Sequence, residues 1–252
     1  MTSFLITTLA LTWCALGAAA ETLPSYLHQC SRRDPKLQAC YVEAIMHIRP
    51  WLAQGIPEVD VPSTEPFRLA ELSLSLTEGR GGYRISLKDI DVTGVSNFTV
   101  RDLTVGEAGA FSLDVDIPLL SLVADYSSSG VLIMIPASGR GTLHGELGRV
   151  RTQLRGALSV RGADRADRAG RQHVHVDRLL VDLKVGDVSM RIDRAPGENF
   201  IIAQATNMLL RTSGHLVLDA MMPELRLKLA DVFLGIANNI FAKVSVDQLL
   251  RD

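Results

Sequence analysis

The sequence predicts an α+β fold in which a strongly curved antiparallel β-sheet is rolled around a long C-terminal α-helix. Apolar residues recur with a period of two from Leu69 to Ile192, which is typical of strands, and with the helical period from Phe200 to Phe241. No change of composition marks a second domain. Apolar residues make up 47% of the 252-residue chain and charged residues 21%, so we expect one large apolar interior.

The first residues predict a signal peptide, 1–20, that is removed after Ala20. An apolar run from Phe4 to Leu16 is followed by three alanines, the small residues found at signal-peptidase sites. An N-terminal membrane anchor is the alternative, but it needs about 18 to 20 apolar residues and this run is shorter. We therefore expect a secreted, extracellular protein with one domain over 21–252 and no stable membrane insertion.

Cys30 and Cys40 remain after that cleavage. In an oxidising compartment, an even pair at this spacing predicts a disulfide that closes a short loop. A zinc site with His28 and His47 is the alternative, but nine residues between the cysteines do not match zinc-finger spacing.

Asp34 and Pro35 predict the start of a helix, with the aspartate as N-cap and the proline in the first turn. Apolar residues then recur at helical spacing, and Pro50 with Gly55 is expected to end the helix. The Pro-rich stretch 56–66 predicts an extended connector.

The region from Leu69 to Ile192 predicts a long antiparallel meander, because alternating segments are separated by turn clusters such as "EGRGG", "SSSG" and "ASGRG". The alternation changes phase between 147 and 150, and we expect a bulge near Gly148. It changes twice more within 173–192, the second time at Gly186, as in a bent strand. The charged run 161–172 is expected to be a solvated loop.

His173 and His175 share a strand face opposite to Val174 and Val176. No carboxylate or cysteine joins them at ligand spacing, so we expect both to face solvent and to bind no metal.

Two helices are predicted after the meander. The first covers Phe200 to Leu210, Thr212 or Ser213 acts as a cap, and the second runs from Leu216 to Phe241 with a kink at Pro223. The apolar stripe of the second helix is wider than one core face requires, as expected for a helix that the sheet encloses.

The sequence contains no Gly-x-Ser-x-Gly, His-Glu-x-x-His or Gly-Lys-Ser/Thr motif, so we expect a protein without catalytic activity and without a cofactor. The formal net charge of -2 and the lack of a phosphate-neutralising run argue against a nucleic-acid partner.

Several ordered motifs resemble insect takeout proteins and the related haemolymph juvenile-hormone-binding proteins. They begin with Cys30 and Cys40 and continue through "AIMHIRPWLAQGIPEVDVPSTEPF", "LKDIDVTGVSNFTV", "DVDIPLLSLVADYSSSGVLIMIPASGRG", "VDRLLVDLKVGDVSMRI" and "IANNIFAKV". The second cysteine pair that is usual in the dedicated hormone carriers is absent, so the chain is more similar to a takeout protein.

The resemblance implies an elongated roll with an internal hydrophobic tunnel. It also implies a carrier, secreted into haemolymph or another extracellular fluid, for a juvenile-hormone-like terpenoid, a fatty acid or a similar lipid. We expect a monomer, with a cell-surface receptor as a further partner. The apolar or aromatic side chains that we expect to line the interior are Trp51, Phe67, Tyr126, Met134, Phe200, Met208, Met221, Met222 and Phe233.

Asn97 begins an Asn-Phe-Thr sequon and is a candidate N-glycosylation site. Two other functions stay open from the sequence. One is an interaction protein that has a filled core and presents a surface to a receptor, and the other is an ester hydrolase or isomerase.

Overall fold

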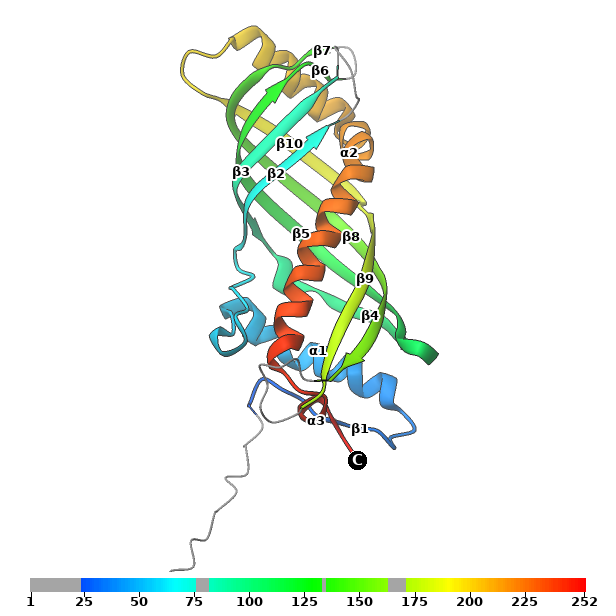
Figure 1. The fold of residues 1–252 in the computed structure, drawn as a ribbon. Coiled ribbons are helices and arrows are strands. Elements are labelled where there is room, and N and C mark those ends of the chain that lie inside the picture. The colour runs from blue at the N-terminus through cyan, green and yellow to red at the C-terminus, as the bar shows by residue number, and fades with distance from the viewer. Residues whose placement is uncertain (1–23, 76–81, 133–134, 163–170) are drawn as a thin grey trace, which may run out of the picture.

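The computed structural model describes residues 24–75, 82–132, 135–162 and 171–252. The expected signal peptide, Met134 and most of the charged run 161–172 lie outside the described residues. Figure 1 shows one elongated α+β domain, in which a curled antiparallel sheet faces a long helix.

The main sheet has seven strands within the described residues. Their bounds are β2 (Phe67–Ser75), β3 (Arg84–Thr93), β4 (Thr99–Val105), β5 (Ala110–Ser129), β8 (Gly139–Arg161), β9 (His173–Lys184) and β10 (Asp187–Arg194). The two longest strands, β5 and β8, pair along 18 register positions and form the middle of the sheet. Two shorter strands flank this central pair on each side: β3 and β4 pair with β5, whereas β10 and β9 pair with β8. Strand β2 pairs with the other side of β3.

In the middle of the sheet, the inward-facing side chains change from one alternation phase to the other. The expected bulge is not what causes this change. Ile117 pairs with Val150 and Leu119 pairs with Gly148, so the register of β5 against β8 continues without an inserted residue. Both strands change phase together, because Arg149 has a left-handed φ of 49° opposite Pro118. A shared change of phase bends the sheet while its ladder stays in register.

The two phase changes predicted for 173–192 are confirmed. Val176 pairs with Leu158 and Arg178 pairs with Ala157, so Asp177 is an extra residue in β9. The second change separates β9 from β10 at Gly186, whose N–H donates to the Gly148 carbonyl at 3.0 Å.

The long helix α2 (Phe200–Lys243) lies along the concave side of the sheet (Figure 1). Its backbone leaves helical angles at Ser213 (φ -137°, ψ 27°), which divides it into a short arm and a long arm, as the sequence predicted. The Asn199 side chain caps the start of the short arm by accepting from the N–H groups of Ile201 and Ile202. The long arm continues through Pro223.

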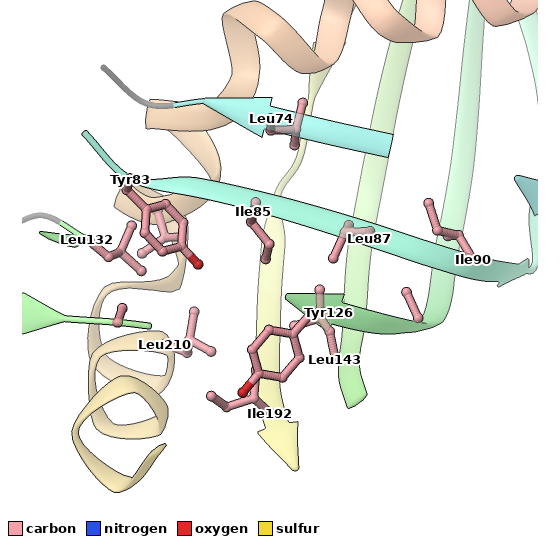
Figure 2. Close-up of a cluster of buried hydrophobic side chains, with 13 residues drawn as sticks. Leu74, Tyr83, Ile85, Leu87, Ile90, Tyr126, Leu132, Leu143, Ile192 and Leu210 are labelled. Carbon is pink, nitrogen blue, oxygen red and sulfur yellow. The ribbon is translucent and has the colours of Figure 1, made fainter. Parts of the chain in front are cut away.

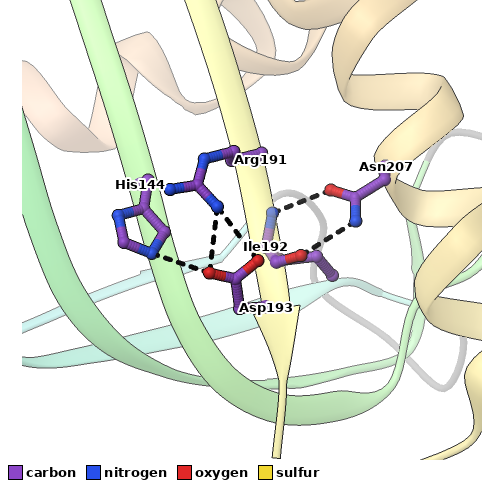
Figure 3. A network of polar contacts seen from close by, with 5 residues as sticks. All are labelled: His144, Arg191, Ile192, Asp193 and Asn207. Carbon is purple, nitrogen blue, oxygen red and sulfur yellow. Dashed lines mark hydrogen bonds and ion pairs between the residues drawn. The ribbon is translucent and has the colours of Figure 1, made fainter.

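Two asparagines on α2 bind the free edges of the sheet. Asn207 Nδ2 donates to the Ile192 carbonyl and its Oδ1 accepts from the Ile192 N–H, both at 2.8 Å (Figure 3). Asn238 makes the same pair of contacts with Val176, at 2.8 and 3.1 Å. Since β10 and β9 are edge strands, the helix supplies partners for backbone groups that the sheet leaves unpaired.

The N-terminal segment and the C-terminus close the end of the roll nearer to α1 (Leu37–Gln54). The predicted disulfide between Cys30 and Cys40 is present. It joins α1 to β1 (Cys30–Ser31), and β1 pairs in parallel with β11 (Leu250–Arg251), which follows the short helix α3 (Val246–Leu249).

Helix α1 begins later than predicted but ends at Gly55, as predicted. It begins after Lys36, whose N–H is held by the Asp34 carboxylate at 2.7 Å, so Asp34 stabilises the preceding turn. Pro50 lies inside the helix, and the chain turns at Gly55, which has a φ of 88° that favours glycine. The expected extended connector contains a short 3-10 helix, Pro57–Val59.

The largest core cluster fills the end of the roll nearer to the short arm of α2 (Figure 2). Alternate residues of β3, such as Ile85 and Leu87, point towards Leu210 of the helix and Leu132 of β6 (Val131–Leu132), which pairs with β7 (Ile135–Pro136). A second cluster packs the long arm of α2 against β8 and β9, and a third lies beneath α1.

Candidate functional site

An apolar cavity of about 450 Å³ lies between the concave face of the sheet and α2. Its volume is within the range of about 300 to 1,000 Å³ that is typical of small-molecule sites. Strands β2, β3, β5, β8, β9 and β10 contribute to its wall, together with both arms of α2.

The helix lines the cavity with one stripe. In the long arm this stripe includes Leu218, Met221, Leu225, Leu229, Phe233, Ile236 and Ile240, and Val217 beside Leu218 also lines the cavity. Neighbours in the stripe are three or four residues apart, which keeps them on one face of a helix. At 1.5 Å per residue the stripe from Leu218 to Ile240 is about 33 Å long, so the cavity is elongated along the roll.

The strands line the cavity with alternate residues. Ile85 and Leu87 of β3 point inwards, as does Tyr83 just before the strand, as expected for the period of two. Along β5 the residues that line the cavity shift from odd numbers at Ile117 to even numbers at Leu120. The shared change of phase at Arg149 and Pro118 keeps apolar residues on the inner face across this shift. The alternation that predicted strands therefore also produces the apolar wall.

Polar groups gather at the end of the cavity nearer to the short arm. Tyr126, Ser138, Arg194, Glu198 and Asn199 contribute there. Of all the described wall residues, Ser138, Arg194 and Asn199 are the three whose surfaces are largely exposed, so this end of the cavity reaches solvent.

Two tyrosines supply neutral hydroxyl groups near this opening. Burial raises the pKa of Tyr83 to about 12. Burial also raises the pKa of Tyr126, and the charge of Glu198 raises it further. Glu198 pairs with Arg140 through Oε1 and Nε at 3.3 Å. At neutral pH both tyrosines therefore keep the phenol proton and can donate a hydrogen bond.

Four of the nine side chains predicted to line the interior lie on the cavity wall. They are Phe67, Tyr126, Met221 and Phe233. Sequence reasoning missed the leucines, isoleucines and valines that make up most of the wall. Their alternation on the strands was visible, but the side that faced the helix was not.

Four others lie elsewhere, and Met134 is outside the described residues. Trp51 is 40% exposed and packs edge-to-face on Tyr26, with ring centroids 6.5 Å apart. Phe200 and Met208 are 57% and 70% exposed on the outer face of the short arm. Met222 is buried against Val150 and Leu183, because a one-residue step on a helix turns a side chain by about 100° from Met221.

The histidines of β9 differ from the prediction that both face solvent. His173 is half-buried, with Nδ1 3.1 Å from the Phe241 carbonyl and 3.2 Å from the Val244 carbonyl, at the C-terminal end of α2. His175 is half-buried, and its Nδ1 lies 3.3 Å from a carboxylate oxygen of Asp177. The first residue of β9, His173, therefore lies beside the C-terminal end of α2, whereas His175 contacts an exposed carboxylate of its own strand.

Among the described residues, one group of three metal-ligand side chains lies close together: His28 with Cys30 and Cys40. The two sulfur atoms are bonded to each other in the disulfide, so they are not thiolate ligands. None of the described helices has the length and apolar character needed to cross a bilayer.

Comparisons with known proteins agree with this architecture. Two curated relatives are circadian clock-controlled protein daywake from Drosophila yakuba and from Drosophila melanogaster, each 22% identical to this chain. The alignment with the Drosophila yakuba protein covers 92% of this chain and 90% of that protein. The alignment with the Drosophila melanogaster protein covers 98% of this chain and 96% of that protein.

The crystal structure of Epiphyas postvittana Takeout 1 has the same fold. It superposes with a TM-score of 0.75 at 16% sequence identity, over 90% of this chain and 100% of that chain. A model of the haemolymph juvenile hormone binding protein family matches residues 7–251. The chain therefore belongs to the haemolymph juvenile hormone binding protein family, whose members are binding proteins for lipophilic ligands.

Proposed function

We propose that the protein is a secreted, non-catalytic carrier that holds one hydrophobic small molecule in the cavity beneath α2, which serves as a tunnel. The observation that carries this proposal is the apolar wall, built from alternate strand residues and one helix stripe. A juvenile-hormone-like terpenoid, a fatty acid or a similar lipid fits such a wall. Each methylene group moved from water to this wall contributes about 0.8 kcal/mol before the costs of association.

The opening supports a ligand with one polar end. The Tyr126 hydroxyl offers a donor beside the exposed Arg194 and Asn199, while the rest of the wall is almost entirely apolar. A molecule with a long apolar body and a single polar group would match both parts.

The direct experiment is organic extraction of protein purified from its native secretion, followed by mass spectrometry. A stoichiometric lipid or terpenoid is expected. Displacement of a fluorescent fatty acid from the recombinant protein gives an independent measurement. If extraction and displacement both show nothing, the carrier proposal is wrong.

A pair of variants separates the cavity from the surface. Leu225→Trp places a larger side chain in the wall, and we expect at least about a tenfold loss of probe affinity because the added ring occupies ligand space. Leu227→Trp is the matched control, because Leu227 is on the same helix but is 65% exposed. Equal affinity in the two variants would place the probe outside the cavity.

The wild-type recombinant protein, compared with Leu225→Trp, tests the expected absence of catalysis. We expect no turnover of a generic aryl ester above that of Leu225→Trp, since the sequence contains neither a Gly-x-Ser-x-Gly nor a His-Glu-x-x-His motif. Secretion after cleavage at Ala20 is tested by N-terminal sequencing of the secreted protein. The proposed monomeric state is tested by analytical sedimentation.

A cell-surface receptor remains a proposed partner. Saturable binding of the labelled protein to cells tests this proposal.

A further inference from the structure

The short arm of α2 carries an exposed apolar surface at the end of the roll where the cavity opens. Phe200, Ile201 and Met208 are 57%, 75% and 70% exposed. We call these three side chains the tip patch. Ile201 and Met208 are seven residues apart, about two helical turns, so they share one face of the arm.

The opposite face of the same arm is part of the cavity. Ile202, Ala203, Thr206 and Leu210 line the wall. Asn207 fixes the arm through its paired hydrogen bonds with Ile192 of β10 (Figure 3). The arm therefore cannot turn the tip patch inwards without breaking both its wall contacts and this pair of hydrogen bonds.

The tip patch adjoins the opening in sequence and in space. Asn199 is an exposed wall residue, and its side chain holds the N–H of Ile201 at 2.9 Å. The guanidinium of Arg194, another exposed wall residue, lies over the Phe200 ring at 5.8 Å from its centroid. Apolar side chains thus lie next to the place where the cavity reaches solvent.

The charges around the tip patch favour an anionic surface. Residues 194–213 contain two arginines, Arg194 and Arg211, and one acid, Glu198. The acid is paired with a third arginine, Arg140. The local charge is positive although the whole chain has a formal net charge of -2. Exposed apolar side chains combined with guanidinium groups are typical of helices that bind at a lipid interface.

We propose that the tip patch docks on an anionic phospholipid surface and turns the cavity opening towards it. In that position an apolar ligand moves between the bilayer and the cavity without crossing bulk water. Phe200, Ile201 and Met208 enter the interface, and the arginines contact lipid phosphate groups. The docking is peripheral and involves the surface of the short arm. The benefit of docking to ligand exchange rests on the proposed carrier function.

Vesicle flotation tests the docking. The full mature chain is mixed with vesicles of phosphatidylcholine alone or of phosphatidylcholine with phosphatidylserine. We expect flotation with the anionic vesicles, weakening as salt is added. The double variant Ile201→Ser/Met208→Ser should reduce vesicle binding at least about tenfold, because two interfacial anchors are lost.

A matched double variant controls for exposed apolar residues in general. Leu180→Ser/Leu227→Ser changes two leucines that are 59% and 65% exposed on β9 and on the long arm of α2, and it should bind vesicles as the wild type does. Arg211→Glu should weaken binding to anionic vesicles, whereas Arg178→Glu, on an exposed position of β9, should not. Circular dichroism checks that each variant is folded.

Each other outcome overturns the proposal. Wild-type protein that does not float, or a tip-patch variant that floats as well as the Leu180/Leu227 variant, excludes docking through the tip patch. A dimer in sedimentation that the tip-patch variant abolishes, without any vesicle binding, shows that a second copy covers the patch. Protease-sensitive binding to cells without vesicle binding shows that a protein partner covers it.

The cavity is measured separately, in solution. The tip-patch variant should bind a soluble fluorescent probe with wild-type affinity but load it from vesicles more slowly. If no probe binds to any form of the protein, the proposed carrier function fails, whereas the flotation result still decides the docking.

Discussion

Asn238 on the long arm of α2 binds the backbone of Val176 through both atoms of its amide, as Asn207 on the short arm binds Ile192. In each pair the side-chain oxygen accepts from the strand N–H at 2.8 Å and the side-chain nitrogen donates to the strand carbonyl. The two contacts fix the two arms of one broken helix against two successive edge strands. They therefore set the position of α2, which forms one side of the cavity, and they also contribute to the stability of the fold.

Asn238→Ala should lower the free energy of unfolding by about 1 to 3 kcal/mol, because the two backbone groups of Val176, a residue that is buried in the core, lose their partners. Urea denaturation followed by circular dichroism measures this change. Asn239→Ala is the control, since the neighbouring asparagine is exposed and an exposed substitution has a small effect. Equal losses in both variants would show that helix propensity, and not the paired hydrogen bonds, accounts for the effect.

Glu65 should make stability depend on pH. Burial raises the pKa of Glu65, but hydrogen bonds from the N–H groups of Ser96 and Gly94, at 2.7 and 2.8 Å, lower it more. A lowered folded-state pKa stabilises the fold above the ordinary value of 4.5, and this contribution is lost as the pH falls below it.

The measurement for Glu65 is urea denaturation at several pH values. Glu65→Gln should cost about 1 kcal/mol at pH 7, after allowance for solvent screening, and the gap to the wild type should close in acid. A gap that stayed constant as the pH fell through this range would exclude the carboxylate as its source.

Tyr126→Phe should separate ligands by their polar ends. The hydroxyl at the cavity opening is neutral, because burial and Glu198 raise its pKa, and it can donate a hydrogen bond to an ester, alcohol or acid group. Removing it should weaken such ligands about twofold to tenfold and leave a pure hydrocarbon unchanged. Competition titrations with matched chain lengths measure the difference, and an equal loss for the hydrocarbon would indicate altered packing instead.

Asn97 should carry an N-linked glycan if the protein passes through the secretory pathway. Its side chain is exposed at the end of the 3-10 helix Val95–Asn97, where a transferase can reach it. Endoglycosidase treatment of the secreted protein should lower its mass, and Asn97→Gln should abolish that change. Secreted wild-type protein of unmodified mass would reject the site.

Much of the fold was predictable because its signals are local. The change of period located the sheet and the final helices, an interruption of the helices was expected at Thr212 or Ser213, and Gly186 was expected to break the last strand. The disulfide partners followed from their number and spacing. The error near Gly148 had a physical source: a phase change in one strand looks the same in sequence whether one residue is inserted or two paired strands turn together.

The candidate site was less predictable. Met221 lies on the wall and Met222 lies behind it, although the two residues have the same chemistry and adjacent positions. Phe200 and Met208 were expected inside, but Asn207 fixes the short arm with their side chains outwards. A hydrophobicity pattern cannot make that distinction, because lining a cavity and covering a surface use the same side chains.

The sequence by itself determined the order of the first helix, the antiparallel meander and the final helices, the cysteine pair, the break in the last helix and the apolar character of the interior. These follow from the periods of helix and strand and from local turn and capping chemistry. The tertiary structure alone decided which residues face the cavity, where it opens, and how the N- and C-terminal segments meet at β1 and β11. Those relationships depend on contacts between residues far apart in the chain, so the helix rotation and strand pairing that create them leave no local pattern.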